Sequence, residues 1–268
     1  MEYITLNNGV KMPIVGTGTN TYGKENNEFN GALKNEIPEL LSALELGYRS
    51  IDAAIMYRNE ELVGRVLAES GVPREELFIT TKVPSDEEYI SSKETTRAAI
   101  DRCLTNFRTD YLDLLLIHFP IEDKEQLKNT WEVFEDYYEA GKLKAIGVSN
   151  FGKDLLDEMK EFAKVKPAVN QIQLNLKEPN KELLAVIKEN GITPVAWGPM
   201  KTEPHQQEVL DEIGKAYNKT GAQVLLRYQI QRGVVVIPKS HNRQNQAANI
   251  DLFDFELTPQ DTAKIDNL

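Results

Sequence analysis

The chain has 268 residues, of which 41% are hydrophobic, so it is long and apolar enough to bury a sizeable core. Its formal net charge of −11 argues against non-specific binding to nucleic acid, because phosphate backbones attract an excess of Lys and Arg. The lone Cys103 excludes an internal disulfide, and with no leader-like N-terminus and no apolar run near the ~20 residues that span a bilayer, we expect a cytoplasmic protein without a membrane partner.

The first predicted element is a β-hairpin, made of "YITL" (3–6), the turn "NNG" (7–9) and "KMPIVG" (11–16). Beyond the hairpin, short apolar runs rich in β-formers alternate with longer segments in which apolar residues recur at helical spacing. The eight apolar runs cover residues 14–19, 49–54, 77–83, 111–118, 145–150, 168–174, 193–199 and 234–240. Between the last two apolar runs, the spacing of apolar residues predicts two helices, 206–218 and 221–232.

This alternation predicts the fold class. Strands that read as continuous apolar runs are buried on both faces, and strict β–α alternation indicates a parallel sheet. Eight such units in a chain of this length favour a (β/α)8 TIM barrel preceded by the hairpin. An open, doubly wound sheet is the alternative, but no Gly-x-Gly-x-x-Gly motif opens the first helix. With no linker visible, residues 1–268 are predicted to form a single domain.

Polar residues stand at the ends of three successive predicted strands, where the active site of a barrel lies. They are Asp52, Lys82 and His118, and Tyr57 follows in the loop after Asp52. Each residue alone has an ordinary interpretation: a helix cap, a solvated strand end, a core histidine and a packed aromatic ring. Four titratable side chains of different types at one rim indicate chemistry instead of packing.

The four side chains suit proton donation to a reacting oxygen. A phenol has an ordinary pKa of about 10, and the Lys82 ammonium should lower the pKa of Tyr57. Asp52 would keep the buried Lys82 charged, and His118 would orient the reacting oxygen through a hydrogen bond. These groups can protonate an alkoxide as it forms, but they cannot supply an electron pair. A separate hydride donor is therefore required.

At these residues the chain resembles the aldo-keto reductases, which are NAD(P)H-dependent carbonyl reductases built on a (β/α)8 barrel. The resemblance covers essentially the whole length, and the order and spacing of its motifs are specific. The matching stretches are "LNNGVKMPIVGTGT", "GYRSIDAAIMYRNEELVG", "LFITTKV", "YLDLLLIHFP", "GKLKAIGVSNF", "VNQIQLN", "GITPVAWGPM", "VVVIPKS" and "FDFELT".

The resemblance implies roles for individual residues. Asp52, Tyr57, Lys82 and His118 match the catalytic residues of the family, with the tyrosine as the acid, and the family's hydride comes from the nicotinamide. Asp52 also counts among the cofactor contacts. Ser149, Asn150 and Gln171 match residues that bind the carboxamide, and Trp197 matches the ring that stacks on the nicotinamide. The remaining implied cofactor contacts are Gly18 and Thr19 on the first strand, Gly198, Pro199 and Met200 beside the pyrophosphate, Lys239 and Ser240 at the 2′-phosphate, and Asn249 at the adenine.

Two departures from the family pattern concern the cofactor. Asn245 stands where the family often has an arginine that contacts the 2′-phosphate, and Ala248 replaces an acidic adenine contact. Arg243 either substitutes for that arginine at the same helix start or is an ordinary solvated residue. We expect NADPH as the cofactor, with NADH as the alternative.

The substrate side departs as well. Asn20 and Phe119 stand where the family has tryptophans, and with His118 they are the expected substrate contacts. This less aromatic mouth predicts a smaller or more polar carbonyl substrate, unless Tyr22 or Tyr89 fills the gap. The first loop (20–35) is longer than usual and could form a lid. The chain stops at "KIDNL", without the family's long C-terminal substrate loop, so we expect an open pocket and broad specificity.

Two other classes of function compete with an NADPH-dependent reductase of small-molecule aldehydes and ketones. One is a nucleotide-binding regulatory subunit with vestigial activity, because the family includes potassium-channel β subunits. The other is a metal-dependent hydrolase, which the sequence disfavours because His118, His205 and His241 show no ligand spacing. We expect no bound metal, His205 and His241 facing solvent, and a monomer.

Overall fold

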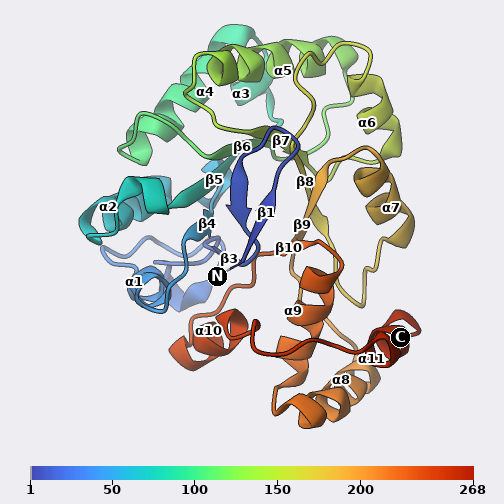
Figure 1. Cartoon of the computed structure of the whole chain (residues 1–268). Helices are drawn as coiled ribbons and strands as arrows, with labels where there is room; N and C mark the ends of the chain where they lie inside the picture. Colours follow the sequence, from blue (N-terminus) through green and yellow to red (C-terminus); the bar gives the residue numbers. More distant parts are fainter. Residues whose placement is uncertain (1) are drawn as a thin grey trace.

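The computed structural model describes residues 2–268 and shows eight parallel strands surrounded by helices (Figure 1). Hydrogen bonding joins the strands in sequence order, and a parallel bridge between Val15 and Val236 brings the first strand back to the last. The strands are β3 (Gly16–Gly18), β4 (Ser50–Asp52), β5 (Phe78–Val83), β6 (Leu114–Ile117), β7 (Ile146–Ser149), β8 (Val169–Gln173), β9 (Thr193–Trp197) and β10 (Val235–Val236). The predicted (β/α)8 barrel is confirmed.

The helices lie outside the strands (Figure 1). They are α1 (Pro38–Glu45), α2 (Glu60–Glu69), α3 (Glu87–Ile90), α4 (Lys93–Asn106), α5 (Lys124–Glu139), α6 (Lys153–Met159), α7 (Lys181–Glu189), α8 (Pro204–Tyr217), α9 (Gly221–Gln231), α10 (Arg243–Ile250) and α11 (Pro259–Asp266). Side-chain caps fix several of their starts; for example, Ser92 and Thr95 form a capping box at α4. None of these helices, in the part of the chain that the structure describes, is long and apolar enough to cross a membrane.

The predicted N-terminal hairpin is present and closes one end of the barrel. Its strands, β1 (Tyr3–Thr5) and β2 (Lys11–Pro13), pair antiparallel. In the turn between them, the Asn7 side-chain amide donates to the carbonyls of Pro167 and Gly191, which lie just before β8 and β9. The hairpin therefore covers the N-terminal ends of the strands and leaves the C-terminal ends open (Figure 1).

Strand register aligns the functional positions at the C-terminal rim. Gly18 pairs with Asp52, and Asp52 with Thr80, so Lys82 lies two residues further along the next strand. On the other side of the barrel, Ser149 pairs with Gln171. Every residue of β5 is buried, including Lys82, which is fully enclosed in the barrel. Parallel pairing thus brings residues distant in sequence to one rim.

The last predicted strand is shorter than its sequence suggests. The apolar run 234–240 forms only a two-residue ladder in β10 (Val235–Val236). Pro238 has no N–H to donate to a ladder, so pairing ends before it. The residues that follow, Lys239 and Ser240, are held by side-chain contacts with other loops instead.

Candidate active site

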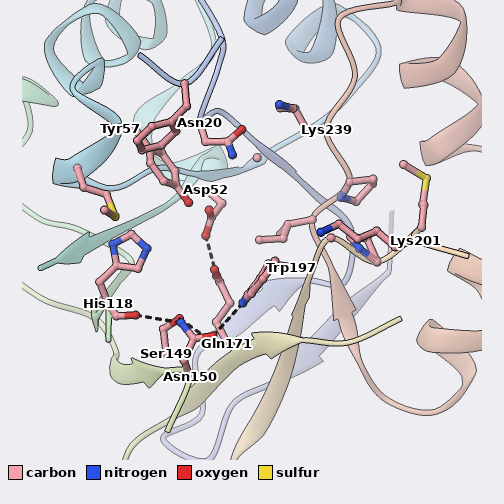
Figure 2. A pocket seen from close by; sticks show the side chains of 18 of the residues that line it. Asn20, Asp52, Tyr57, His118, Ser149, Asn150, Gln171, Trp197, Lys201 and Lys239 are labelled. Atoms are coloured by element: carbon pink, nitrogen blue, oxygen red, sulfur yellow. Dashed lines mark hydrogen bonds between the residues drawn. The ribbon is translucent and has the colours of Figure 1, made fainter. Parts of the chain in front are cut away.

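One large cavity of about 640 Å³ opens at the C-terminal ends of the barrel strands (Figure 2). Its wall contains fourteen of the residues selected from the sequence. They are Gly18, Asn20, Asp52, Tyr57, His118, Phe119, Ser149, Asn150, Gln171, Trp197, Gly198, Pro199, Met200 and Lys239. Figure 2 shows Tyr57 and His118 at one end of this space, with Trp197 and Lys239 on its other side.

A buried ion pair lies beneath the cavity. The Lys82 ammonium donates to Asp52 Oδ1 at 2.7 Å and to the Ala53 carbonyl at 2.8 Å. The second carboxylate oxygen of Asp52 accepts from the Gln171 side-chain amide at 2.8 Å. Both charges are thus enclosed, paired and hydrogen-bonded, which a buried ion pair requires to offset its desolvation. The remaining donor of Lys82 points at the Tyr57 hydroxyl, 3.4 Å away.

Local backbone geometry presents Tyr57 to the cavity. After β4, the chain forms a short 3-10 turn, η2 (Ile55–Tyr57), and Arg58 then adopts a left-handed conformation with φ of 57°. The helix that follows, α2, is anchored by buried Glu60, whose carboxylate accepts from Thr81 and Asn106. Since Thr81 directly precedes Lys82, this contact ties the segment that carries the phenol to the strand that carries the ammonium.

Burial and charge act on the phenol in opposite directions. Burial raises the pKa of Tyr57 above its ordinary value, whereas the adjacent Lys82 ammonium lowers it, and burial is the larger effect. The pKa of Lys82 is also raised, because the attraction of Asp52 and Tyr57 for the ammonium outweighs the burial that opposes it. The sequence predicts a lowered pKa for Tyr57 from the neighbouring Lys82 alone. That effect is present, but burial outweighs it, so the predicted direction is wrong.

His118 is buried and uncharged. Its burial and the nearby Lys82 ammonium lower the pKa of the imidazole to about 3. The ring stacks on Phe119 with 4.5 Å between centroids and meets the Tyr57 ring edge-on at 5.9 Å. Its Nδ1 is buried without a hydrogen-bond partner among residues 2–268. The structure therefore keeps a neutral imidazole beside the phenol.

A chain of hydrogen bonds crosses the floor of the cavity (Figure 2). Trp197 Nε1 donates to the side-chain carbonyl of Asn150, whose amide donates to the His118 carbonyl and to Ser149 Oγ. Ser149 Oγ in turn donates to the carbonyl of Gln171. The polar side chains expected at a carboxamide are thus held in fixed orientations, and the indole is fixed beside them.

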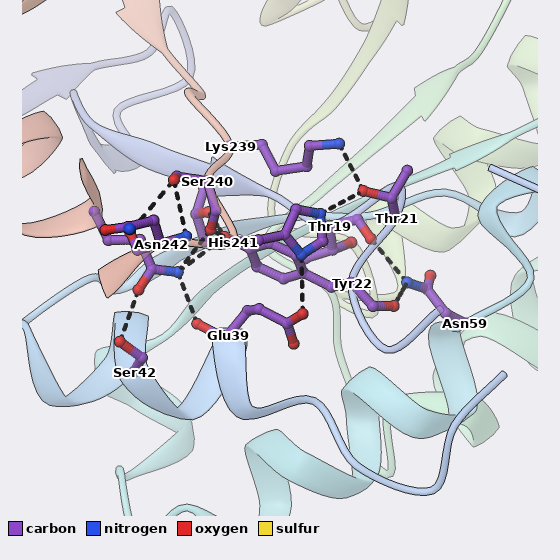
Figure 3. A network of polar contacts seen from close by, with 12 residues as sticks. Thr19, Thr21, Tyr22, Glu39, Ser42, Asn59, Lys239, Ser240, His241 and Asn242 are labelled. Carbon is purple, nitrogen blue, oxygen red and sulfur yellow. Dashed lines mark hydrogen bonds and ion pairs between the residues drawn. The ribbon is translucent and has the colours of Figure 1, made fainter. Parts of the chain in front are cut away.

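A second polar network surrounds Lys239, at the edge of the cavity (Figure 3). The Lys239 ammonium donates to Thr21 Oγ1 at 2.6 Å, and that hydroxyl also contacts His241 Nε2 at 2.9 Å. His241 Nδ1 lies 2.9 Å from Glu39 Oε1. Burial lowers the pKa of Lys239. The expectation that His241 faces solvent holds only in part, because the side chain is 24% exposed while Thr21 and Glu39 contact its two ring nitrogens and the Tyr22 ring meets it edge-on.

A model of the Aldo/keto reductase family matches residues 14–268 of the chain. The chain belongs to the aldo/keto reductase family. The glyoxal reductase of Bacillus subtilis (strain 168) is 45% identical over 269 residues, which cover 100% of this chain and 92% of the relative. The 9,11-endoperoxide prostaglandin H2 reductase of Trypanosoma cruzi (strain CL Brener) is 39% identical over 270 residues, covering 99% and 90%.

Solved structures of aldo/keto reductases have the same fold. The enzyme from Brucella melitensis superposes with a TM-score of 0.89 at 34% identity, covering 99% of this chain and 98% of that one. The Bombyx mori aldo-keto reductase in complex with NADP gives a TM-score of 0.88 at 35% identity, covering 99% and 92%. These comparisons confirm the family suggested by the sequence motifs. This aldo/keto reductase is therefore an oxidoreductase that acts on carbonyl groups.

Some residues selected from the sequence lie outside the cavity wall of this aldo/keto reductase. They are Thr19, Lys82, Ser240, Arg243 and Asn249. Thr19 donates to the Asp52 carbonyl. Arg243 Nη1 donates to Glu45 at 2.7 Å and to Ser42 Oγ at 3.1 Å, so one nitrogen of the guanidinium is engaged by α1. Asn249 is buried, and its side-chain nitrogen lacks a hydrogen-bond partner among the described residues.

Five wall residues of the aldo/keto reductase were not selected from the sequence. They are Phe29, Met56, Lys201, Ile237 and Pro238. Met56, Lys201 and Pro238 directly adjoin a selected residue, and Ile237 lies two residues before Lys239, so proximity in sequence could have found these four. Phe29 is different, because it comes from the middle of the long first loop and no local pattern marks it.

Proposed function

We propose that this aldo/keto reductase reduces small aldehydes and ketones with NADPH as the hydride donor and Tyr57 as the proton donor. The observation that carries the proposal is a contact among three groups. The Lys82 ammonium lies 2.7 Å from Asp52 Oδ1 and 3.4 Å from the Tyr57 hydroxyl, and both of these partners line the cavity. A phenol beside a fixed cation suits proton donation better than packing, because its conjugate anion is stabilised in place.

The raised pKa of Tyr57 suits an acid that works at neutral pH. The phenol remains protonated until the substrate oxygen gains negative charge. When the proton moves from Tyr57 to that oxygen, the Lys82 ammonium stabilises the phenolate left behind. Asp52 holds the ammonium in position and balances its charge. The phenolate then regains a proton from solvent, which completes the cycle for the protein.

His118 assists this proton transfer as a neutral hydrogen-bond donor, without gaining or losing a proton itself. With a pKa of about 3, the imidazole is neutral at pH 7 and carries one N–H. That N–H can donate a hydrogen bond to the carbonyl oxygen of a substrate next to Tyr57. A neutral donor also avoids placing a second positive charge beside Lys82.

The cavity has the chemistry needed for NADPH. The amide and hydroxyl groups of Ser149, Asn150 and Gln171 suit the carboxamide, and the fixed Trp197 ring offers an aromatic surface to the nicotinamide. Lys239 supplies a cation for phosphate on a chain that is acidic overall. Once bound, the nicotinamide supplies the hydride. The structure of the similar Bombyx mori enzyme with NADP supports this choice of cofactor.

The preference for NADPH over NADH depends on few groups. Arg243 is engaged by Glu45, and Asn245 is uncharged, which leaves Lys239 as the main cation near the expected 2′-phosphate. We therefore expect a preference for NADPH that is modest in comparison with a site containing a free arginine. The substrate class follows the similarity to a glyoxal reductase, and we infer small reactive carbonyls such as methylglyoxal.

The experiment that tests the proposal compares the purified protein with Tyr57→Phe. The wild-type protein should oxidise NADPH in the presence of methylglyoxal or 4-nitrobenzaldehyde, followed by absorbance at 340 nm as the standard readout for NADPH. Tyr57→Phe should lower kcat by at least about a hundredfold, because the proton donor is lost. NADPH binding, measured by quenching of Trp197 fluorescence, should change little.

A matched control is Tyr138→Phe, on α5 and outside the cavity wall, which should retain full turnover. Equal turnover in Tyr57→Phe and wild type would contradict the assigned acid. Tight NADPH binding without turnover on any carbonyl would instead favour a nucleotide-binding regulatory subunit.

A further inference from the structure

The first loop folds into a compact excursion beside the cavity. Lys24 and Leu33 form an antiparallel bridge, and the Glu25 N–H donates to the Ala32 carbonyl at 2.9 Å. The Lys34 N–H donates to the Gly23 carbonyl at 2.8 Å. Residues 23–25 and 32–34 thus form a paired stem. We call residues 26–31, which connect the two sides of the stem, the loop tip.

Two cations fasten the loop tip at Phe29. The Lys24 ammonium donates to the Phe29 carbonyl at 2.5 Å, and the Arg58 guanidinium donates to the same carbonyl at 3.1 Å. Arg58 also donates to the Asn30 side-chain oxygen at 3.0 Å. Arg58 directly follows Tyr57, so the loop tip is bonded to the residue next to the proposed proton donor.

The same contacts orient the ring of Phe29. The Lys24 ammonium lies 4.5 Å from the ring centroid, a favourable cation–π distance. Burial, together with Arg58 and Lys239, lowers the pKa of Lys24 to about 8, which still leaves most of the ammonium charged at pH 7. The ring meets the Tyr57 ring edge-on at 6.2 Å and lines the cavity. With 38% of Phe29 exposed, an aromatic surface remains available to a ligand beside the phenol.

We propose that Phe29 is a specificity-determining residue, which selects carbonyl substrates that carry an aryl or other flat apolar group, and that Lys24 and Arg58 are positioning residues for it. This inference rests on the proposed carbonyl reduction at Tyr57. Asn20 and Phe119 predicted a smaller or more polar substrate, and Phe29 adds to the small carbonyls proposed above a preference for those that carry an aryl group. Tyr22 does not fill the gap, because its ring is buried and its hydroxyl is bonded to Thr17 and Ser240.

The position of the substrate's substituent in the cavity explains the proposed preference for aryl groups. A carbonyl oxygen that reaches both the Tyr57 hydroxyl and His118 leaves its substituent among the other wall residues at that end, which include Met56, Phe119 and Phe29. These are apolar, and aromatic rings favour edge-to-face or offset contacts with another ring. A substrate without a ring makes few of these contacts and therefore gains little from Phe29.

The experiment compares two substrates across a set of variants. Phe29→Ala should lower kcat/KM for 4-nitrobenzaldehyde about tenfold, mainly through KM, because a contact made equally in the ground state and the transition state is lost. For methylglyoxal, kcat/KM should stay within about twofold of wild type. Phe29→Tyr should restore the preference for the aryl substrate. Thermal unfolding of each variant checks that the protein remains folded.

Lys24→Met tests the positioning role. It should shift selectivity in the same direction as Phe29→Ala, and Lys24→Arg should rescue it, because a cation again reaches the Phe29 carbonyl and ring. Leu33→Ala is the matched control on the same loop; its side chain is 49% exposed and lies outside the cavity wall. Its selectivity should equal that of wild type.

The outcomes separate this inference from the proposed function. An equal loss for both substrates in Phe29→Ala, or no loss for either, would overturn the role of Phe29. If the wild-type protein reduces neither substrate, the proposed function fails, and binding of 4-nitrobenzyl alcohol measured by calorimetry decides the present inference. About tenfold weaker binding to Phe29→Ala than to wild type would support it, and equal or undetectable binding would overturn it.

Discussion

At the scale of single residues, the site depends on a competition between burial and charge at Tyr57. Desolvation raises the pKa of the phenol more than the Lys82 ammonium lowers it. The protein therefore holds a protonated phenol at neutral pH. The adjacent Lys82 ammonium is positioned to stabilise the phenolate that forms when the proton is transferred. In the direction of reduction, the acid form should be present throughout the neutral range, because burial raises the pKa of Tyr57 above that of an ordinary phenol.

The buried His118 should make the protein less stable in acid. Its pKa is about 3 in the folded chain and about 6.5 when unfolded, so between these values only the unfolded chain binds the extra proton. Stability therefore falls as the pH falls through this window. Between pH 7 and pH 4.5, wild type should lose about 2 kcal/mol more than His118→Asn, measured by urea unfolding. An equal loss in both proteins would contradict a neutral, buried imidazole.

The sequence was a good guide to residues at strand ends and a poor one for residues in loops. Asp52, Lys82 and His118 could be selected because a parallel barrel brings the ends of its strands together. Phe29 and the contacts of His241 could not, because loop conformation depends on tertiary hydrogen bonds that leave no periodic pattern. The direction of the Tyr57 pKa was missed for a similar reason, since burial depends on the packed structure.

At the scale of elements, close contacts between helices restrict the sequence. Gly64 in α2 packs against the end of α4, where an added Cβ would overlap the Asn106 carbonyl oxygen and lie 2.6 Å from Phe107 Cα. Helix propensity alone predicts that Gly64→Ala stabilises α2 by about 1 kcal/mol. A clash with backbone atoms cannot be relieved by a side-chain rotation, so packing should outweigh propensity.

We therefore expect Gly64→Ala to destabilise the protein by about 2 kcal/mol or more in urea unfolding. Gly152→Ala is the control, because a Cβ at Gly152 would meet no atom within 4 Å. Gly152 is the N-cap of α6, and its substitution should cost no more than about 1 kcal/mol. A Gly64→Ala protein that is as stable as wild type would show that α2 and α4 can move apart.

Most elements followed from sequence periodicity. The two helices expected at 206–218 and 221–232 correspond to α8 (Pro204–Tyr217) and α9 (Gly221–Gln231). The expected strand 234–240 is largely irregular, because Pro238 interrupts the ladder. Periodicity reports burial, and residues 234–238 are indeed buried, but it does not report which backbone groups find a partner.

At the scale of the whole molecule, the site forms only when the barrel closes. Asp52 on β4 is bonded to Lys82 on β5 and to Gln171 on β8, which is 119 residues away in sequence. No single supersecondary unit contains all three groups. The count and order of the apolar runs predicted this closure. The packing of the first loop against α10, where the Gln246 side-chain amide donates to the Tyr22 hydroxyl, could be known only from the structure.

The most direct test of the account is the pH dependence of the reverse reaction, oxidation of 4-nitrobenzyl alcohol with NADP⁺, in wild type and Lys82→Met. This direction requires the phenolate of Tyr57, so kcat/KM should rise with pH as the phenol ionises. Removing the ammonium should move the rising limb to higher pH by at least about one unit. If kcat/KM rises over the same pH range in both proteins, the claim that Lys82 stabilises the anion of Tyr57 is contradicted.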